Sequence, residues 1–129
     1  MACLDTSFLI DLLRGEEKVE GLYKDLIDTE IRLCIAAPSI MEIWSGACSA
    51  NTPKEKEKVL ALIRGLEILD LSLDSAKEAG EIEASLRKKG KIIDTEDCMI
   101  AGIAKLYGEK VVTGDIHFSY IDGLKVLKY

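Results

Sequence analysis

Residues 1–13, MACLDTSFLIDLL, contain the pattern that decides the fold. The short apolar run Ala2–Leu4 has the length of a buried strand, and Asp5 follows it directly. Residues Thr6–Leu13 then place apolar side chains at helical spacing, and Arg14-Gly15 is a common signal for the end of a helix. The stretch therefore predicts a strand, an acid at the end of that strand, and a helix.

The same alternation of short apolar runs and helical patterns continues along the chain. It predicts further strands at Arg32–Ala36, Leu66–Leu69, Lys110–Thr113 and Leu124–Leu127. It predicts further helices at Lys18–Asp28, from Pro38 through Ala47, at Lys54–Arg64, from Ser72 or Asp74 through Lys89, and from Asp94 or Thr95 through Leu106. We therefore expect a single α/β domain over residues 1–129, with helices on both faces of a central parallel sheet of about five strands.

Composition and charge exclude several classes of protein. The hydrophobic fraction of 48% and the charged fraction of 31% are typical of a globular domain, and 129 residues suffice for a substantial core. The net charge of -6 argues against salt-driven binding of nucleic acid by a basic surface. No apolar run approaches the ~20 residues of a membrane span, and Phe8–Leu13 lacks the basic leader of a signal peptide.

The cysteines and the histidine do not form a zinc pattern. The four cysteines include no Cys-x-x-Cys pair, and His117 is the only histidine. Small buried thiols in a reducing cytoplasm are the simpler interpretation. We expect a cytoplasmic protein that does not associate with a membrane.

Four acids fall near the predicted ends of strands. Asp5 follows the first strand and Asp115 follows the fourth, while Glu42 and Asp97 lie in the first turns of two predicted helices. Because the carboxyl ends of parallel strands share one edge of a sheet, these side chains could converge there. Clustered carboxylates repel one another, and a hard divalent cation such as Mg²⁺ or Mn²⁺ relieves that repulsion. The four acids are therefore candidate metal ligands and catalytic residues.

Each acid also has a purely structural interpretation. Asp5 could cap the first helix, Glu42 could be an exposed helix residue, and Asp115 could be a turn residue. Asp94 and Asp97 lie three residues apart and could both be acids of a first helical turn. Taken together, four acids at strand exits favour a functional site over four separate structural roles.

Four short motifs resemble those of the PIN-domain ribonucleases. They are LDTSFLID at Leu4–Asp11, SIMEI at Ser39–Ile43, DCMIA at Asp97–Ala101 and TGDIHF at Thr113–Phe118. The motifs occur in the family's order across nearly the whole chain, and the chain length is similar to that of single-domain VapC-type toxins of prokaryotic toxin–antitoxin pairs.

The resemblance implies a three-layer, Rossmann-like α/β/α fold and an endoribonuclease that depends on Mg²⁺ or Mn²⁺. It implies metal ligands at Asp5, Glu42, Asp97 and Asp115, with Asp5 and Asp97 the most direct. It places Thr6, Ser7 and Thr113 along the site and Asp94 farther out. It also implies an RNA substrate, a cognate antitoxin protein and a homodimer. Gly114 stands where the family commonly has a polar or basic residue, so we expect no side-chain contact with substrate there.

Two other functions remain open at this point. A receiver-type phosphoacceptor domain is also a small parallel α/β protein with an acidic metal pocket, and Asp70 ends the third predicted strand. Such a domain would need paired acids after its first strand, whereas Asp5 is followed by Thr6. A PIN-like binding module without catalytic turnover is the other alternative.

Overall fold

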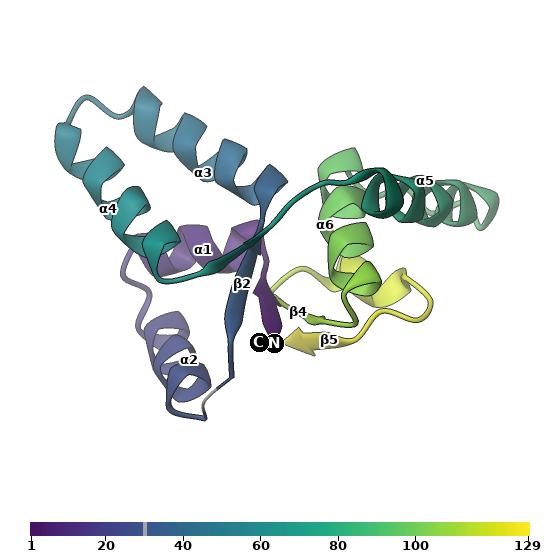
Figure 1. Cartoon of the computed structure of the whole chain (residues 1–129), viewed down its shortest axis with the longest axis horizontal. Helices are drawn as coiled ribbons and strands as arrows, with labels where there is room; N and C mark the ends of the chain where they lie inside the picture. The colour runs from purple at the N-terminus through teal and green to yellow at the C-terminus, as the bar shows by residue number, and fades with distance from the viewer. Residues whose placement is uncertain (30) are drawn as a thin grey trace.

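The computed structural model describes residues 1–29 and 31–129, which form a parallel sheet of five strands (Figure 1). The strands are β1 (Ala2–Leu4), β2 (Leu33–Ala36), β3 (Glu67–Leu69), β4 (Lys110–Thr113) and β5 (Val126–Lys128). Their order is β3-β2-β1-β4-β5, and every neighbouring pair is parallel. Receiver-type domains have the order 2-1-3-4-5, so the topology excludes the phosphoacceptor alternative.

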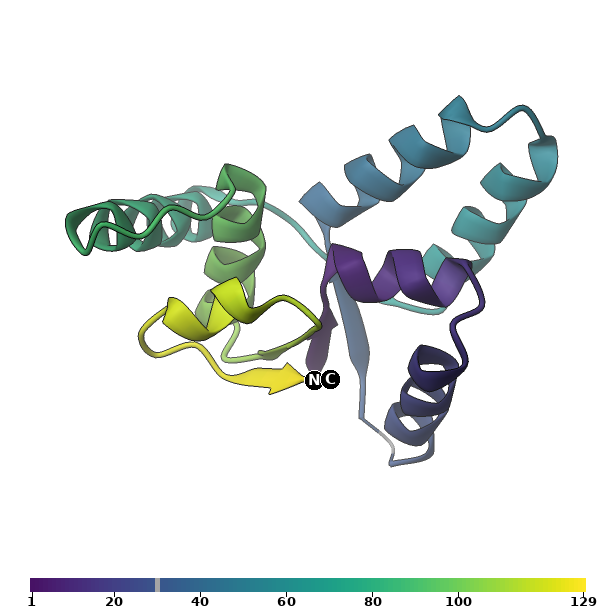
Figure 2. The ribbon, with the colours of Figure 1, turned by 180° about the vertical axis from the view of Figure 1, so that it is seen from behind.

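Helices cover both faces of the sheet, as the sequence predicts (Figures 1 and 2). They are α1 (Thr6–Leu13), α2 (Glu17–Asp28), α3 (Ala37–Ser49), α4 (Pro53–Arg64), α5 (Leu73–Lys88), α6 (Thr95–Leu106) and the short 3-10 helix η1 (Ile116–Tyr120). Helices α1 to α4 pack on one face and share a core cluster with it. Helices α5, α6 and η1 pack on the other face around a second cluster. The predicted three-layer α/β fold is confirmed.

Most predicted elements differ from the observed ones by only one or two residues at an end. The exception is η1, for which the sequence analysis predicts no element. Its start is fixed by a side chain, because Asp115 Oδ1 accepts a hydrogen bond from the backbone N–H of His117 at 2.9 Å. Over the described part of the chain, no helix has the length and apolar character that crossing a membrane requires.

The inner strands are apolar on both sides because helices cover both faces of the sheet. All three residues of β1 are fully buried, and Cys3 pairs in register with Cys34 of β2. A hydrogen bond with Cys34 and burial together raise the pKa of the Cys3 thiol well above its usual value. Cys98 is also a buried thiol, whereas Cys48 lies exposed on α3, so the expectation of buried cysteines is wrong at that one position.

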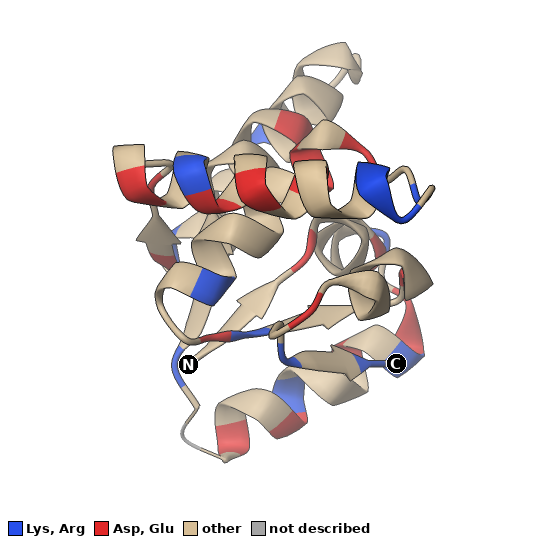
Figure 3. Cartoon of the chain, turned by 90° about the vertical axis from the view of Figure 1, so that its right-hand side faces the viewer, with Lys and Arg blue, Asp and Glu red and all other residues tan. Residues whose placement is uncertain are grey.

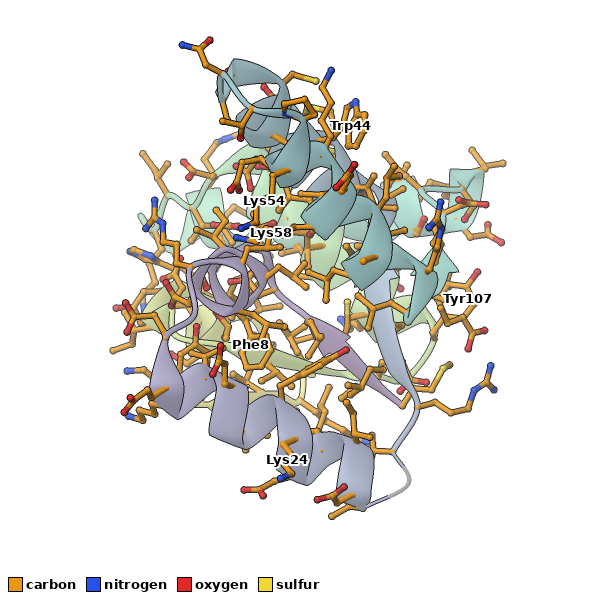
Figure 4. The ribbon with its side chains drawn as sticks, turned by 90° about the vertical axis from the view of Figure 1, so that its left-hand side faces the viewer. Phe8, Lys24, Trp44, Lys54, Lys58 and Tyr107 are labelled. Atoms are coloured by element: carbon orange, nitrogen blue, oxygen red, sulfur yellow. The ribbon has the colours of Figure 1, made fainter. Side chains whose placement is uncertain are left out.

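Helices α3 and α4 form a hairpin that extends away from the sheet (Figure 1). Pro53 begins α4 in the first helical turn, where its missing N–H costs no hydrogen bond. Lys58 of α4 reaches back to α1, and its Nζ donates to the Leu13 carbonyl at 3.1 Å (Figure 4). The hairpin is thereby attached to the helix that follows β1.

Helices α5 and α6 cross at very close range through Gly102. A Cβ atom at this position would lie 2.7 Å from both the Ala79 nitrogen and the Ser75 carbonyl oxygen, which are backbone atoms of α5. Glycine is therefore required here by contact between two helix backbones. Gly80, in the exposed part of α5, has nothing within 4 Å of the equivalent point.

We expect Gly102→Ala to destabilise the protein by about 2 kcal/mol or more, because overpacking costs roughly 1–3 kcal/mol when the neighbouring atoms are free to shift. Gly80→Ala is the matched control and should stabilise by about 0.5–1 kcal/mol, since alanine is the better helix former. Urea unfolding of both variants measures the difference. Equal stability of the two alanine variants would contradict the close packing of α5 against α6.

Candidate functional site

The order of the strands reverses between β1 and β4, and this position in a parallel α/β sheet is where ligands commonly bind. β1 pairs with β4 through Leu4 and Val112, and the Asp5 N–H donates to the Val112 carbonyl at 3.0 Å. Asp5 and Asp115 therefore leave neighbouring strands at the same edge. Helix α6 leads into β4, so the N-terminus of α6 lies at this edge as well.

Asp5 is a buried carboxylate with one unpartnered oxygen. Its exposed fraction is 2%, and its Oδ2 accepts hydrogen bonds from Ser7 Oγ and Thr113 Oγ1, both at 2.7 Å. Its Oδ1 is buried without a hydrogen-bond partner. Burial raises the pKa of Asp5, and the charge of Asp115 adds to the rise, although the two hydroxyls oppose it. The side chain makes no cap hydrogen bond to α1, so capping does not explain its position.

Thr113 connects the ends of β1 and β4. Its hydroxyl donates to Asp5 and accepts the backbone N–H of Asp115 at 2.9 Å, and the residue is fully buried. Asp115 Oδ1 in turn lies 2.6 Å from His117 Nδ1. The orientation of Asp115 is therefore fixed from both sides, by β4 and by the first turn of η1.

The first turn of α6 brings Asp97 to the same edge. Burial raises the pKa of Asp97 to about 7, and the charges of Asp5, Asp115, Asp94 and Glu42 contribute to the rise. Asp94 precedes α6 as an exposed residue and makes no cap hydrogen bond. Asp5, Asp115 and Glu42 thus all lie near enough to Asp97 to raise its pKa, and the charge of Asp94 raises it more than that of Glu42 does.

Glu96 is a fifth acid at this edge, and the sequence analysis does not identify it. Burial raises the pKa of Glu96 to about 8, together with a hydrogen bond to Glu42 and the charges of Glu42, Asp97 and Asp5. Glu96 Oε1 is buried without a partner. Glu42 itself is exposed on α3, so its side chain approaches the cluster from the outside. The only sequence signal for Glu96 is its place beside Asp97 in the first turn of a helix.

The three predicted hydroxyl residues have different roles. Ser7 and Thr113 bind Asp5 directly. Thr6 Oγ1 instead donates to Ser39 Oγ at 2.9 Å, and both residues are buried. Thr6 therefore joins the start of α1 to the first turn of α3, and its hydroxyl contacts another hydroxyl instead of a carboxylate.

These acids gather without forming a ready-made ligand set. Among residues 1–29 and 31–129, no three Asp, Glu, His or Cys side chains are placed to hold one ion as they stand. The chemistry of the donors nevertheless fits a hard divalent cation, because Asp5 Oδ1 and Glu96 Oε1 are buried oxygens with free lone pairs. Burial raises the pKa values of Asp5, Glu96 and Asp97, and the charges of neighbouring acids add to each rise, so a cation bound here would favour the charged forms.

Comparison with known proteins agrees with the motifs and the fold. The family model for the PIN domain matches residues 2–124. A "tRNA(fMet)-specific endonuclease VapC" of Salmonella typhimurium is 36% identical over 128 residues, which cover 95% of this chain and 93% of the relative. "Ribonuclease VapC11" of Mycobacterium tuberculosis is 28% identical, with 94% and 91% of the two chains covered.

Solved structures show the same arrangement of elements. A DNA-bound VapBC from Salmonella typhimurium superposes with a TM-score of 0.88 at 30% identity, and the match covers 99% of this chain and 98% of the other. VapBC2 from Rickettsia felis, bound to a promoter DNA fragment, has a TM-score of 0.90 and the same coverage, and at 22% identity it supports the fold alone. The chain therefore belongs to the PIN domain family and, within that family, to the VapC group.

Proposed function

We propose that this protein is an endoribonuclease that hydrolyses RNA phosphodiester bonds with the help of Mg²⁺ or Mn²⁺ and acts as the toxin of a toxin–antitoxin pair. The observation that carries the proposal is the buried, unpartnered Oδ1 of Asp5 at the switch point of the sheet, among acids with raised pKa values. Relatives named as ribonucleases support the choice of RNA as substrate.

The acids divide into roles by burial and by hydrogen bonding. Asp5 is buried, Asp97 and Asp115 are both half-buried, and Glu42 is exposed. Asp5 and Asp97 would be the direct metal ligands, as the family motifs imply, while Glu42 and Asp115 would complete the coordination. Ser7 and Thr113 fix Asp5 through its Oδ2, so its Oδ1 stays directed at the site. A bound divalent ion would supply positive charge beside the scissile phosphate and lower the pKa of the attacking water.

The distribution of charge explains why this chain would need such an ion. Helix α5, on the side of the molecule that Figure 3 shows, carries four acidic residues against three cations, and two of the cations, Arg87 and Lys88, lie in its last turn. The protein as a whole carries a net charge of -6. An RNA phosphate would therefore meet repulsion at the acid cluster, and cation binding by the carboxylates would remove it.

The proposed partners follow from the relatives. The VapBC structures are toxin–antitoxin complexes, and we infer that a small antitoxin protein likewise covers this site.

A homodimer is also part of the proposal. Helices α2 and α4 carry the exposed apolar side chains Ile27 and Leu60, which could contribute to a self-complementary face.

The decisive experiment is RNA cleavage by the purified protein under control of divalent ions. We expect cleavage of tRNA and mRNA fragments with Mg²⁺ or Mn²⁺, no cleavage with excess EDTA, and recovery when the metal is added back. Asp70→Asn, which changes an exposed acid at the end of β3, should cleave like the wild type. Cleavage that persists in EDTA would contradict the proposed dependence on a divalent metal ion. RNA binding without cleavage in either metal would favour the non-catalytic module.

A further inference from the structure

An open cavity of about 450 Å³ adjoins the acid cluster on the side of β4 and β5. Its lining includes Ser7 and Asp115, which also belong to the candidate site, and Asp11, Lys18, Gly114 and Tyr129, which do not. The volume lies within the range of about 300–1,000 Å³ that small-molecule pockets occupy. Any chain of nucleotides whose phosphate lies at Asp5 and Asp115 would therefore have this cavity beside it.

The ring of Tyr129 is held in place at the wall of this cavity. It packs edge to face against Phe8, with 5.4 Å between ring centres and 79° between ring planes. Its hydroxyl donates to Asp11 Oδ2 at 3.2 Å, and its backbone N–H donates to the Thr113 carbonyl at 3.2 Å. The ring is only half-buried, so part of it faces the cavity. Three contacts from β4 and α1 thus hold an aromatic surface beside the site.

The ring occupies the space that a side chain at position 114 would need. A Cβ atom on Gly114 would lie 3.2 Å from Tyr129 Cζ and 3.3 Å from its hydroxyl oxygen. These distances are shorter than ordinary carbon contacts, so even a Cβ atom at position 114 would require the ring to shift by a few tenths of an ångström. Glycine at 114 and tyrosine at 129 therefore act as a pair: the first lacks a side chain, and the second places a ring in the space that remains.

The charges around the cavity indicate which part of a nucleotide it suits. Asp11, Glu16 and Asp115 line it, against the single cation Lys18. A phosphate group would be repelled by three carboxylates, whereas a base is uncharged and planar. Bases of single-stranded RNA stack on aromatic side chains, and carboxylates accept hydrogen bonds from base amino groups.

We propose that Tyr129 forms a stacking platform for one RNA base next to the scissile phosphate, and that Gly114 is the positioning residue that makes room for the ring. The inference rests on the proposed function, because it requires an RNA strand in the acid site. The platform requires an unpaired base beside the scissile phosphate, since the bases of a duplex are stacked on one another and unavailable. The space left without a side chain at position 114 is then filled by Tyr129, which directly follows β5.

The test compares the steady-state cleavage of short single-stranded RNAs by variants of the full chain. Tyr129→Ala should raise KM by about 5- to 100-fold, the range that stacking on one aromatic side chain supports, with a smaller change in kcat. Tyr129→Phe keeps the ring and should stay within about threefold of the wild type. Gly114→Ala shifts the ring by a few tenths of an ångström, so it should raise KM in the same direction as Tyr129→Ala but by less, and the double variant should add little to Tyr129→Ala.

An RNA series with an abasic nucleotide at each position near the cleavage site identifies the stacked base. One abasic position should raise KM for the wild type and leave KM unchanged for Tyr129→Ala, because the ring that the base would contact is already gone. Tyr107→Ala is the matched control: this half-exposed tyrosine lies at the end of α6, well away from Phe8 (Figure 4), and KM should not change. Thermal unfolding of each variant confirms that the fold is intact.

The outcomes separate the two proposals. Wild-type cleavage with an unchanged KM in both Tyr129→Ala and Gly114→Ala would overturn the stacking platform and leave the nuclease standing. The platform is likewise overturned if Tyr129→Ala raises KM for the intact RNA and for every abasic RNA by the same factor, because the effect of the ring would then not depend on any base. Failure of the wild type to cleave any RNA in Mg²⁺ or Mn²⁺ would overturn the proposed function and the platform with it.

Discussion

Asp5→Asn is expected to abolish metal-dependent RNA cleavage and, at the same time, to raise the melting temperature of the metal-free protein. Loss of a direct ligand removes several kcal/mol of transition-state stabilisation, which corresponds to at least about a hundredfold lower rate. The stability rises because burial makes the charged carboxylate unfavourable, as the raised pKa of Asp5 indicates. An asparagine keeps the shape and can still accept hydrogen bonds from Ser7 and Thr113.

The two effects are measured on the same preparations, by cleavage of labelled RNA and by thermal unfolding in EDTA. Asp70→Asn provides the control for removing one negative charge, because Asp70 lies exposed after β3. It should change neither the cleavage rate nor the melting temperature appreciably. An Asp5→Asn protein that cleaves at the wild-type rate would disprove the central role given to this carboxylate.

The second large effect concerns pH. The folded protein holds the pKa of Asp97 at about 7 and that of Glu96 at about 8, against usual values of 3.8 and 4.5. Between the unfolded-state and folded-state pKa values of each group, the folded protein binds more protons than the unfolded protein. The stabilisation that Asp97 and Glu96 contribute is therefore complete below pH 4 and is lost as the pH rises towards 8. Solvent screening of the half-exposed groups reduces the loss to about 2 kcal/mol, or about 7 °C in melting temperature.

The measurement is a series of thermal unfolding curves from pH 5 to pH 8.5, with EDTA and with saturating Mg²⁺. In EDTA the melting temperature should fall across this window, and Mg²⁺ should remove most of the fall because a cation stabilises the charged acids. Glu96→Gln and Asp97→Asn should each flatten the EDTA curve. A melting temperature that rises with pH in EDTA would show that the acids are not under mutual repulsion.

Much of the fold follows from the sequence for a definite physical reason. The inner strands β1, β2 and β4 are covered by helices on both faces, so each is a short, nearly continuous apolar run. The edge strand β5 is partly exposed, which blurs the pattern, and it is the only strand whose predicted ends are both shifted, whereas β2 and β3 each begin one residue later than predicted. Ser72 begins α5 with a capping box, one of the two starts that the sequence allows.

The candidate site is predictable only in part. Asp5 and Asp115 can be placed because a strand ends one residue before Asp5 and two residues before Asp115, and the carboxyl ends of parallel strands meet. Glu96 escapes prediction because an acid in the first turn of a helix is already explained by the helix dipole. Tyr129 cannot be predicted as a site residue because its ring comes close to Gly114 only when β5 pairs with β4. No local sequence pattern encodes that contact.

The position of β1 in the middle of the sheet has a consequence for the chain during its synthesis. β1 is made first, yet one of its edges has no partner until β4 arrives more than a hundred residues later. A ribosome that has translated as far as α5 has produced Asp5 and Glu42 without Asp97 or Asp115. The nascent polypeptide would therefore lack two of its four proposed metal ligands until α6 and β4 have also been made, and any destructive activity would begin only after that point.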